Sequence, residues 1–189
     1  VVTELYSYVA FLVVLLTYGF ETAFFRFSKK HQKTKSVYST ALISILFSSI
    51  IFVSIIYYNA LSISSWMGFG VEANFIQWFS IIIGLDAISS ISFAQLREQE
   101  KALRFTFIRL LNIFINIGFN IYFIVYKGFG IQYIFISNLI SSSITILFLA
   151  PQMLASNWIF DKKLWRKMMI YGLPLLVAGL AGMINETID

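Results

Sequence analysis

The chain has 189 residues, of which 59% are apolar and only 12% are charged, and its mean hydropathy is +0.81. Soluble domains carry about 45–50% apolar and roughly 25% charged residues. A soluble fold of this length could not bury so much apolar surface, because small compact bodies keep a large surface-to-volume ratio. The composition therefore excludes an ordinary soluble domain and indicates a membrane protein.

Six stretches are long and apolar enough to cross a bilayer, which takes roughly 20 helical residues. They cover residues 5–25, 37–58, 75–93, 105–126, 131–150 and 168–188, and Pro151 is expected to mark the end of the fifth. Membrane strands would be about 9–11 residues long with alternating polarity, whereas these stretches are apolar on all sides. The sequence predicts an all-α, polytopic membrane helix bundle with about six transmembrane helices.

The ends of the chain and its basic residues bear on its topology. It starts at Val1 without an initiator methionine and stops inside a predicted helix, so we expect a fragment of a longer protein. Of the 14 Lys and Arg residues, 13 lie in or beside the connections 26–36, 94–104 and 152–167. Cytoplasmic loops carry the Lys and Arg excess, so these three connections are expected to face the cytoplasm. Such charge serves topology and anionic-lipid contact, and no nucleic acid partner is expected.

Charged side chains within the spans are candidate site residues, since each costs on the order of 2.5–3.5 kcal/mol at a helix centre. Glu21 and Arg26 lie near the inner end of the first span and diverge by about 140° on an ideal helix. Each is therefore expected to pair with another helix. They could form a cytoplasmic gate or a head-group contact, or a structural pair and a snorkelling arginine.

Asp86 lies in the third span, beside a run of small residues, 87–92, that permits close helix packing. Its carboxylate could bind a coupling ion or a substrate group. It could equally be a structural hydrogen-bond acceptor for a neighbouring helix.

Three amides, those of Asn112, Asn116 and Asn120, share one face of the fourth helix, one turn after Arg109. An amide row suits sugar hydroxyls, because amides both donate and accept hydrogen bonds. Asparagine is also ordinary glue between membrane helices. A weaker polar stripe follows on the next helix, where helix packing is the leading interpretation; it consists of Asn138, Ser142 and Thr145.

The last span combines flexible and charged positions. Its candidate hinge residues are Gly172, Pro174, Gly179 and Gly182, and its polar end holds Asn185, Glu186 and Asp189. Proline removes a helical hydrogen bond and kinks the helix, so a moving, cavity-lining helix is one interpretation. The other is that Asp189 already lies at the outer interface, where a charge costs little.

Signatures of catalysis are missing from the sequence. Without cysteine there are no disulfides or thiolate metal sites. No phosphate-binding glycine loop, metal-binding His/Cys set or nucleophile–base pair is found. We expect no catalytic residue, no metal and no cofactor, and coupling to a Na⁺ or H⁺ gradient is left open.

Three stretches resemble polysaccharide biosynthesis proteins, the O-antigen-type oligosaccharide flippases of the multidrug/oligosaccharidyl-lipid/polysaccharide (MOP) exporter superfamily. They are residues 18–27 (YGFETAFFRF), residues 93–97 together with 101–105, and residues 171–189 (YGLPLLVAGLAGMINETID). The resemblance implies a MATE-like, two-lobe transporter in the full-length protein. Residues 1–151 would hold helices two to six, 152–167 a cytoplasmic linker between the lobes, and 168–189 the start of helix seven.

The implied activity is alternating-access flipping of an undecaprenyl-pyrophosphate-linked oligosaccharide to the outer leaflet of the bacterial inner membrane. Membrane lipids and other polysaccharide-assembly membrane proteins are further implied partners. By the same resemblance, Arg26, Arg97 and Arg109 are candidates for attracting the pyrophosphate. The candidates for gating or ion coupling are Glu21, Asp86, Glu186 and Asp189.

Three other functions stay open, and one of them, a purely structural membrane subunit, would leave the intramembrane charges and the Gly/Pro helix without a purpose. A cation-coupled drug antiporter of the same superfamily would share the fold, although few acidic groups lie deep in the first lobe. A membrane polysaccharide polymerase or ligase would need a sizeable outward loop with catalytic residues, and the outward connections here are short. We therefore expect a transporter and not an enzyme.

Overall fold

The computed structural model describes residues 2–30, 34–67, 72–130 and 132–188. Within these ranges the chain is almost entirely helical and contains no strand. Six of the described helical spans are long and apolar enough to cross a membrane. The predicted all-α membrane bundle is therefore confirmed.

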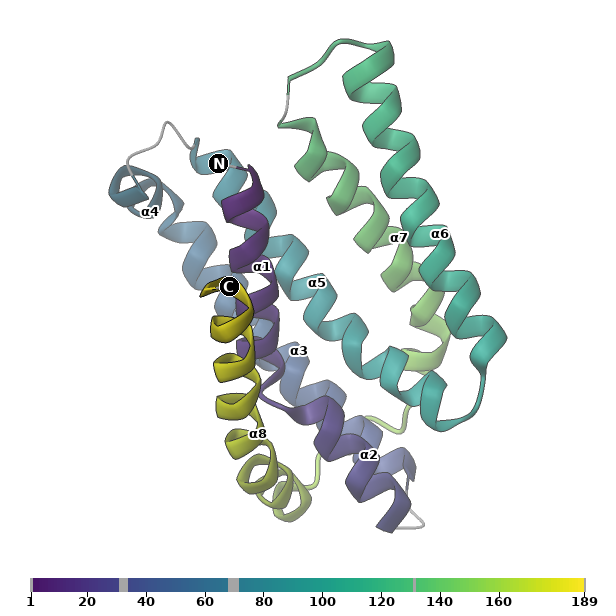
Figure 1. Ribbon diagram of the computed structural model, residues 1–189. Coiled ribbons are helices and arrows are strands. Elements are labelled where there is room, and N and C mark those ends of the chain that lie inside the picture. The colour runs from purple at the N-terminus through teal and green to yellow at the C-terminus, as the bar shows by residue number, and fades with distance from the viewer. Residues whose placement is uncertain (1, 31–33, 68–71, 131, 189) are drawn as a thin grey trace.

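The helices follow the predicted spans, and one short helix, α4, lies outside them. They are α1 (Val2–Thr17), α2 (Phe20–Lys30), α3 (Thr34–Tyr58), α4 (Ala60–Met67), α5 (Ala73–Glu98), α6 (Ala102–Asn120), the π-helix η1 (Ile121–Tyr126), α7 (Tyr133–Leu154) and α8 (Lys162–Ile188). Helix α5 runs through the middle of the bundle, with α6 and α7 on one side and α1, α3 and α8 on the other (Figure 1).

The first predicted span is two helices and not one. The chain breaks between α1 and α2, where Tyr18 and Gly19 adopt positive φ angles of 36° and 72°. Glycine tolerates this conformation because it lacks a Cβ. Residues 5–25 read as one continuous apolar helix in the sequence, so the prediction of an unbroken span was wrong.

The break lies against α8. A Cβ added to Gly19 would come within 2.5 Å of the Gly172 carbonyl oxygen, and one added to Gly172 within 2.7 Å of the Tyr18 carbonyl oxygen. Ser44 of α3 stabilises this crossing of α8 over the α1–α2 break. Its Oγ lies 2.6 Å from the Tyr18 hydroxyl and accepts a 2.9 Å hydrogen bond from Trp165 Nε1. Gly172 therefore acts here as a close-packing position between backbones.

Two predicted boundaries near the α7–α8 connection were wrong. Helix α7 continues through Pro151 to Leu154, because a proline in the last turn removes only one backbone hydrogen bond. Helix α8 starts at Lys162, inside the predicted 152–167 connection. Asp161 caps it, with Oδ1 accepting hydrogen bonds from the backbone N–H groups of Lys163 (2.9 Å) and Leu164 (3.0 Å).

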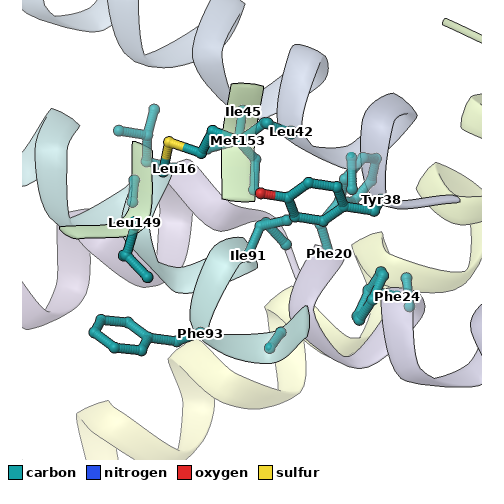
Figure 2. Close-up of a cluster of buried hydrophobic side chains, with 14 of the residues drawn as sticks. Leu16, Phe20, Phe24, Tyr38, Leu42, Ile45, Ile91, Phe93, Leu149 and Met153 are labelled. Atoms are coloured by element: carbon teal, nitrogen blue, oxygen red, sulfur yellow. The ribbon is translucent and has the colours of Figure 1, made fainter. Parts of the chain in front are cut away.

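The core lies where α2, α3, α5 and α7 meet. Large fully buried side chains include Phe20, Phe24 and Phe93, and Figure 2 shows Phe20 and Phe24 near the ring of Tyr38 and Phe93 apart from it. The Tyr38 hydroxyl is satisfied by Ser92 Oγ at 3.0 Å. Helix α6, in contrast, exposes a broad apolar face that includes Phe114, 71% exposed, as a lipid-facing helix does.

The basic connections gather at one end of the bundle. The end of α2, the α5–α6 turn and the start of α8 lie at the bottom of Figure 1, and the α3–α4 and η1–α7 connections lie at the top. Lys33 of the first basic loop lies outside the described residues. The alternation that the loop charges predicted is thus present, while the side of the membrane stays a prediction.

Replacing Gly172 with alanine in the full-length protein should destabilise it, because the new methyl group meets the Tyr18 carbonyl. Overpacking of this kind costs about 1–3 kcal/mol, so the apparent unfolding temperature in detergent should fall. Gly118→Ala is the matched control, since nothing lies within 4 Å of a Cβ there. Equal unfolding temperatures for the two variants would contradict the close crossing.

Single cysteines should report opposite sides of the membrane. In intact cells a membrane-impermeant maleimide should label Lys127→Cys, beyond η1, but should reach Gln99→Cys, beyond α5, only after the cells are opened. Labelling of both in intact cells would overturn the predicted orientation.

Candidate functional site

A polar cavity of about 410 Å³ opens among α1, α2, α5, α6 and α7. We call it the polar cavity. Its charged and polar lining is Glu21, Asp86, Ser89, Ser90, Arg109, Asn112, Asn138, Ser142 and Thr145, and its apolar lining is Val13, Val14 and Phe93. Four of the predicted site residues, Glu21, Asp86, Arg109 and Asn112, thus meet in one place although they come from three helices.

Glu21 forms an ion pair with Arg97, 76 residues further along the chain. The pair joins α2 to the last turn of α5, and both side chains remain accessible, at 41% and 43% exposure. The Arg97 guanidinium also lies over the rings of Phe25, at 5.3 Å, and Phe105, at 5.8 Å. The pair therefore holds α2 against α5 beside the cavity.

Asp86 faces α7 across the cavity. Its Oδ1 accepts a 2.9 Å hydrogen bond from Ser142 Oγ, while Ser89 Oγ donates to the Asp86 main-chain oxygen at 2.9 Å. The small residues that follow Asp86 let α5 pack closely on its neighbours: Ala87 and Ser92 are fully buried. A carboxylate oxygen remains that can accept a further hydrogen bond or bind a cation.

Arg109 is held by an aromatic ring and not by an acid. Its guanidinium lies 4.1 Å from the centroid of the Phe93 ring and 5.9 Å from that of Phe105. It forms no ion pair with any acidic side chain that the structure describes. Stacking of this kind leaves the guanidinium N–H groups at the ring edge free to bind an anion.

The asparagine row connects α6 to α7. Asn112 Nδ2 donates to Thr145 Oγ1 at 2.9 Å, Asn116 Nδ2 donates to Ser141 Oγ at 3.3 Å, and Asn120 Nδ2 donates to Asn116 Oδ1 at 2.7 Å. Only the first of these amides lines the polar cavity. The row is thus mainly interhelical, and its sugar-binding role stays a prediction.

Arg26 lies apart from the cavity. Its guanidinium stacks on the ring of Tyr171 in α8, 4.2 Å from the centroid, and Phe27 packs edge-on against the same ring. Glu21 and Arg26 therefore each contact a different helix, as their angular separation predicts. Arg26 is positioned to join α2 to α8, and its role in attracting pyrophosphate stays a prediction.

The predicted polar end of the last span is only partly visible. Residues 182–188 lie in α8, but their side chains, including those of Asn185 and Glu186, are outside the described part of the chain, as is all of Asp189. Pro174 lies inside α8, and a Cβ added to Gly179 would lie 3.7 Å from Val14 Cγ1 of α1. Helix α8 therefore packs on α1 at this level, and on α2 through the Arg26–Tyr171 contact.

The polar stripe on α7 lines the polar cavity, which the sequence alone did not predict. Asn138, Ser142 and Thr145 were interpreted chiefly as packing residues, yet all three line the cavity. Their spacing of four and three residues on one helical face was the available signal. Among the described residues no group of three His, Cys, Asp or Glu side chains could hold a metal ion.

A double-mutant cycle should show that the amide row couples α6 to α7. Asn116→Ala and Ser141→Ala each remove one partner of the same hydrogen bond. Their effects on unfolding free energy in detergent should differ from additivity by about 0.6 kcal/mol, the average for such bonds in a membrane. Strict additivity would mean that the two side chains do not interact.

Comparison with known proteins gives one result for the whole chain. The family model described as "Polysaccharide biosynthesis protein" matches residues 1–189. Neither curated proteins nor solved structures give a match. The match covers the complete polar cavity and the three stretches whose resemblance was noted. This multi-pass membrane chain therefore belongs to the polysaccharide biosynthesis protein family.

Proposed function

We propose that the protein flips a lipid-linked oligosaccharide from the cytoplasmic to the outer leaflet. The observation that carries this proposal is the polar cavity, in which an arginine that forms no ion pair with a described acidic residue lies beside amides, hydroxyls and two carboxylates inside an apolar bundle. Polar groups within a membrane protein generally face a water-filled cavity or a substrate path. Membership in the polysaccharide biosynthesis family supports a glycan as the cargo.

The chemistry of the lining fits both parts of such a cargo. Arginine N–H groups form bidentate, charge-assisted hydrogen bonds with phosphate oxygens, so Arg109 would bind the pyrophosphate. Asn112, Asn138 and the nearby hydroxyls offer donors and acceptors suited to sugar hydroxyls. The undecaprenyl chain would remain among the lipids, where exposed apolar side chains of α6 already lie.

Transport would proceed by alternating access, with no covalent step and no enzymatic residue. The Glu21–Arg97 pair would close the cytoplasmic side, and release of the pair would free Arg97 for the pyrophosphate. Movement of α8 against the α1–α2 break would accompany opening. In the full-length protein a second lobe would complete the cavity, in the MATE-like arrangement of the MOP superfamily and in the bacterial inner membrane.

A cation-coupled antiporter of the same superfamily is the second candidate. It is favoured by one specific observation, that two carboxylates, those of Glu21 and Asp86, line the polar cavity. In the proposed flippase the same Asp86 would bind a coupling Na⁺ or H⁺. The flippase and the antiporter would therefore use Asp86 in the same way, to bind the coupling ion, and would differ in the cargo they carry.

Complementation tests the proposal. The full-length gene should restore surface polysaccharide in a bacterium that lacks its own flippase and makes a matching lipid-linked glycan. Arg109→Gln should lower the flipping rate at least about tenfold, since a charged hydrogen bond contributes about 1.5–3 kcal/mol, and lipid-linked intermediate should accumulate. Lys127→Gln, which removes an equal charge outside the cavity, should leave flipping unchanged.

Failure to rescue despite confirmed membrane insertion would argue against flipping. Drug efflux that depends on Asp86 would then support the antiporter, and loss of polymerised glycan with normal flipping would indicate a polymerase or ligase.

The variant Asp86→Asn tests whether Asp86 couples transport to an ion gradient without binding the cargo. It should abolish stimulation by an ion gradient while leaving binding of the lipid-linked glycan within about twofold of wild type, because Asn keeps the hydrogen bond from Ser142.

A further inference from the structure

A second pocket lies at the basic end of the bundle, on the other side of α5 from the polar cavity. It has a volume of about 280 Å³ and is formed by α3, α7 and the α5–α6 turn. Gln95 of α5 and Gln99, which follows the helix, line it, whereas Asp86, Ser90 and Phe93 of α5 line the polar cavity. The two sites share no lining residue, so we name this one the basic pocket and treat it separately.

Three cations surround the basic pocket. Lys35 comes from the first turn of α3, Lys101 from the α5–α6 turn and Arg104 from the first turn of α6. No acidic residue lines the pocket, although Glu98 and Glu100 lie on the same turn. None of the three cations forms an ion pair with an acidic group in the described part of the chain. Their charge is therefore available to an anion.

The backbone of the turn fixes where these cations lie. Glu100 adopts a left-handed conformation (φ 56°), and the following N–H of Lys101 donates to the Leu96 carbonyl at 2.9 Å. This tight reversal brings Lys101 and Arg104 back toward the pocket. Arg104 is further held by a 3.2 Å hydrogen bond from Nη2 to the Phe148 carbonyl of α7.

The inner part of the pocket is a fixed polar network. Gln152 Nε2 donates to the Ser92 carbonyl at 2.9 Å and to Gln95 Oε1 at 2.6 Å, and the Tyr38 hydroxyl pairs with Ser92 Oγ. Gln152 Oε1 is buried, and the Tyr38 hydroxyl lies beside the Gln152 side chain. The network therefore fixes the inner wall of the pocket and leaves the cations at its mouth as the groups that a ligand would meet.

We propose that the basic pocket binds the phosphate group of a lipid in the cytoplasmic leaflet. The pocket lies at the helix ends, at the level where head groups meet a membrane protein, and its three uncompensated cations match a phosphate. Its volume lies just below the range of about 300–1,000 Å³ that is usual for drug-sized ligands, so it suits a head group and not an oligosaccharide. The site does not depend on the proposed transport activity.

Two lipids could supply the phosphate, an anionic phospholipid of the bilayer or the pyrophosphate of a polyprenyl carrier. Native mass spectrometry of the full-length protein can compare three probes: phosphatidylglycerol, farnesyl pyrophosphate, and phosphatidylcholine, whose phosphate is neutralised by choline. The anionic probe that binds more tightly identifies the source. Phosphatidylcholine should bind more weakly than either.

The pocket variant is the triple substitution Lys35→Gln, Lys101→Gln, Arg104→Gln. Each cation near a membrane contributes about fivefold to anionic lipid binding, so the triple variant should weaken the preferred probe on the order of a hundredfold. The side chains are exposed, so folding should survive. The matched control, which removes three charges from the start of α8, is Lys162→Gln, Lys163→Gln, Lys167→Gln.

A steric variant separates binding in the pocket from general attraction to the basic surface. Ala155→Phe, just after the end of α7, fills the pocket and keeps every charge, so it should also weaken the preferred probe. The control triple should change binding by less than about twofold. Equal losses in the pocket and control triples, or full binding by Ala155→Phe, would overturn the proposal.

Discussion

Water is absent from the hydrocarbon core, so polar groups on membrane helices must find partners inside the bundle, and in this chain α5 supplies partners to α2, α3 and α7. Within its span 72% of the residues are buried, against 6–33% for the other five described spans. One face of α5 carries Asp86 toward α7 and the polar cavity. The other carries Ser92 and Gln95 toward Tyr38 and Gln152. Both candidate sites are consequences of this central position.

The helices themselves could be predicted from the sequence because hydropathy and length determine them almost alone. The same holds for the candidate residues, since a carboxylate or amide within an apolar span stands out. Their partners could not be predicted. Glu21 meets Arg97 across 76 residues, and Ser142 meets Asp86 across 56. Such pairs depend on which helices are neighbours and how each is rotated, and periodicity within one helix does not determine either.

The α1–α2 break and the start of α8 were not predicted. At each of them a local backbone conformation or a helix cap sets the helix boundary, and hydropathy does not. The α1–α2 break needs only Tyr18 and Gly19 to adopt positive φ angles within an apolar run. The early start of α8 needs only the carboxylate of Asp161 to accept two backbone N–H groups. Both have local signals, a Tyr-Gly pair and an Asp before a basic helical turn. The Tyr-Gly pair recurs at Tyr171 and Gly172, and the two pairs meet at the crossing.

The two arginines near the polar cavity are held differently, and this difference bears on how a cargo would enter. Arg97 is neutralised by Glu21, while Arg109 rests on the Phe93 ring and interacts with the carboxylates of Asp86 and Glu21 from beyond ion-pair distance. In the proposed flippase, an anion that enters from the cytoplasmic side would meet the Glu21–Arg97 pair first and Arg109 behind it. Exposed ion pairs contribute only about 0–1 kcal/mol, so Glu21 can release Arg97 at little cost once an anion is bound. Because the same pair holds α2 against α5, binding of the anion and loosening of α2 would be one event, and α2 leads directly into the break that packs on α8.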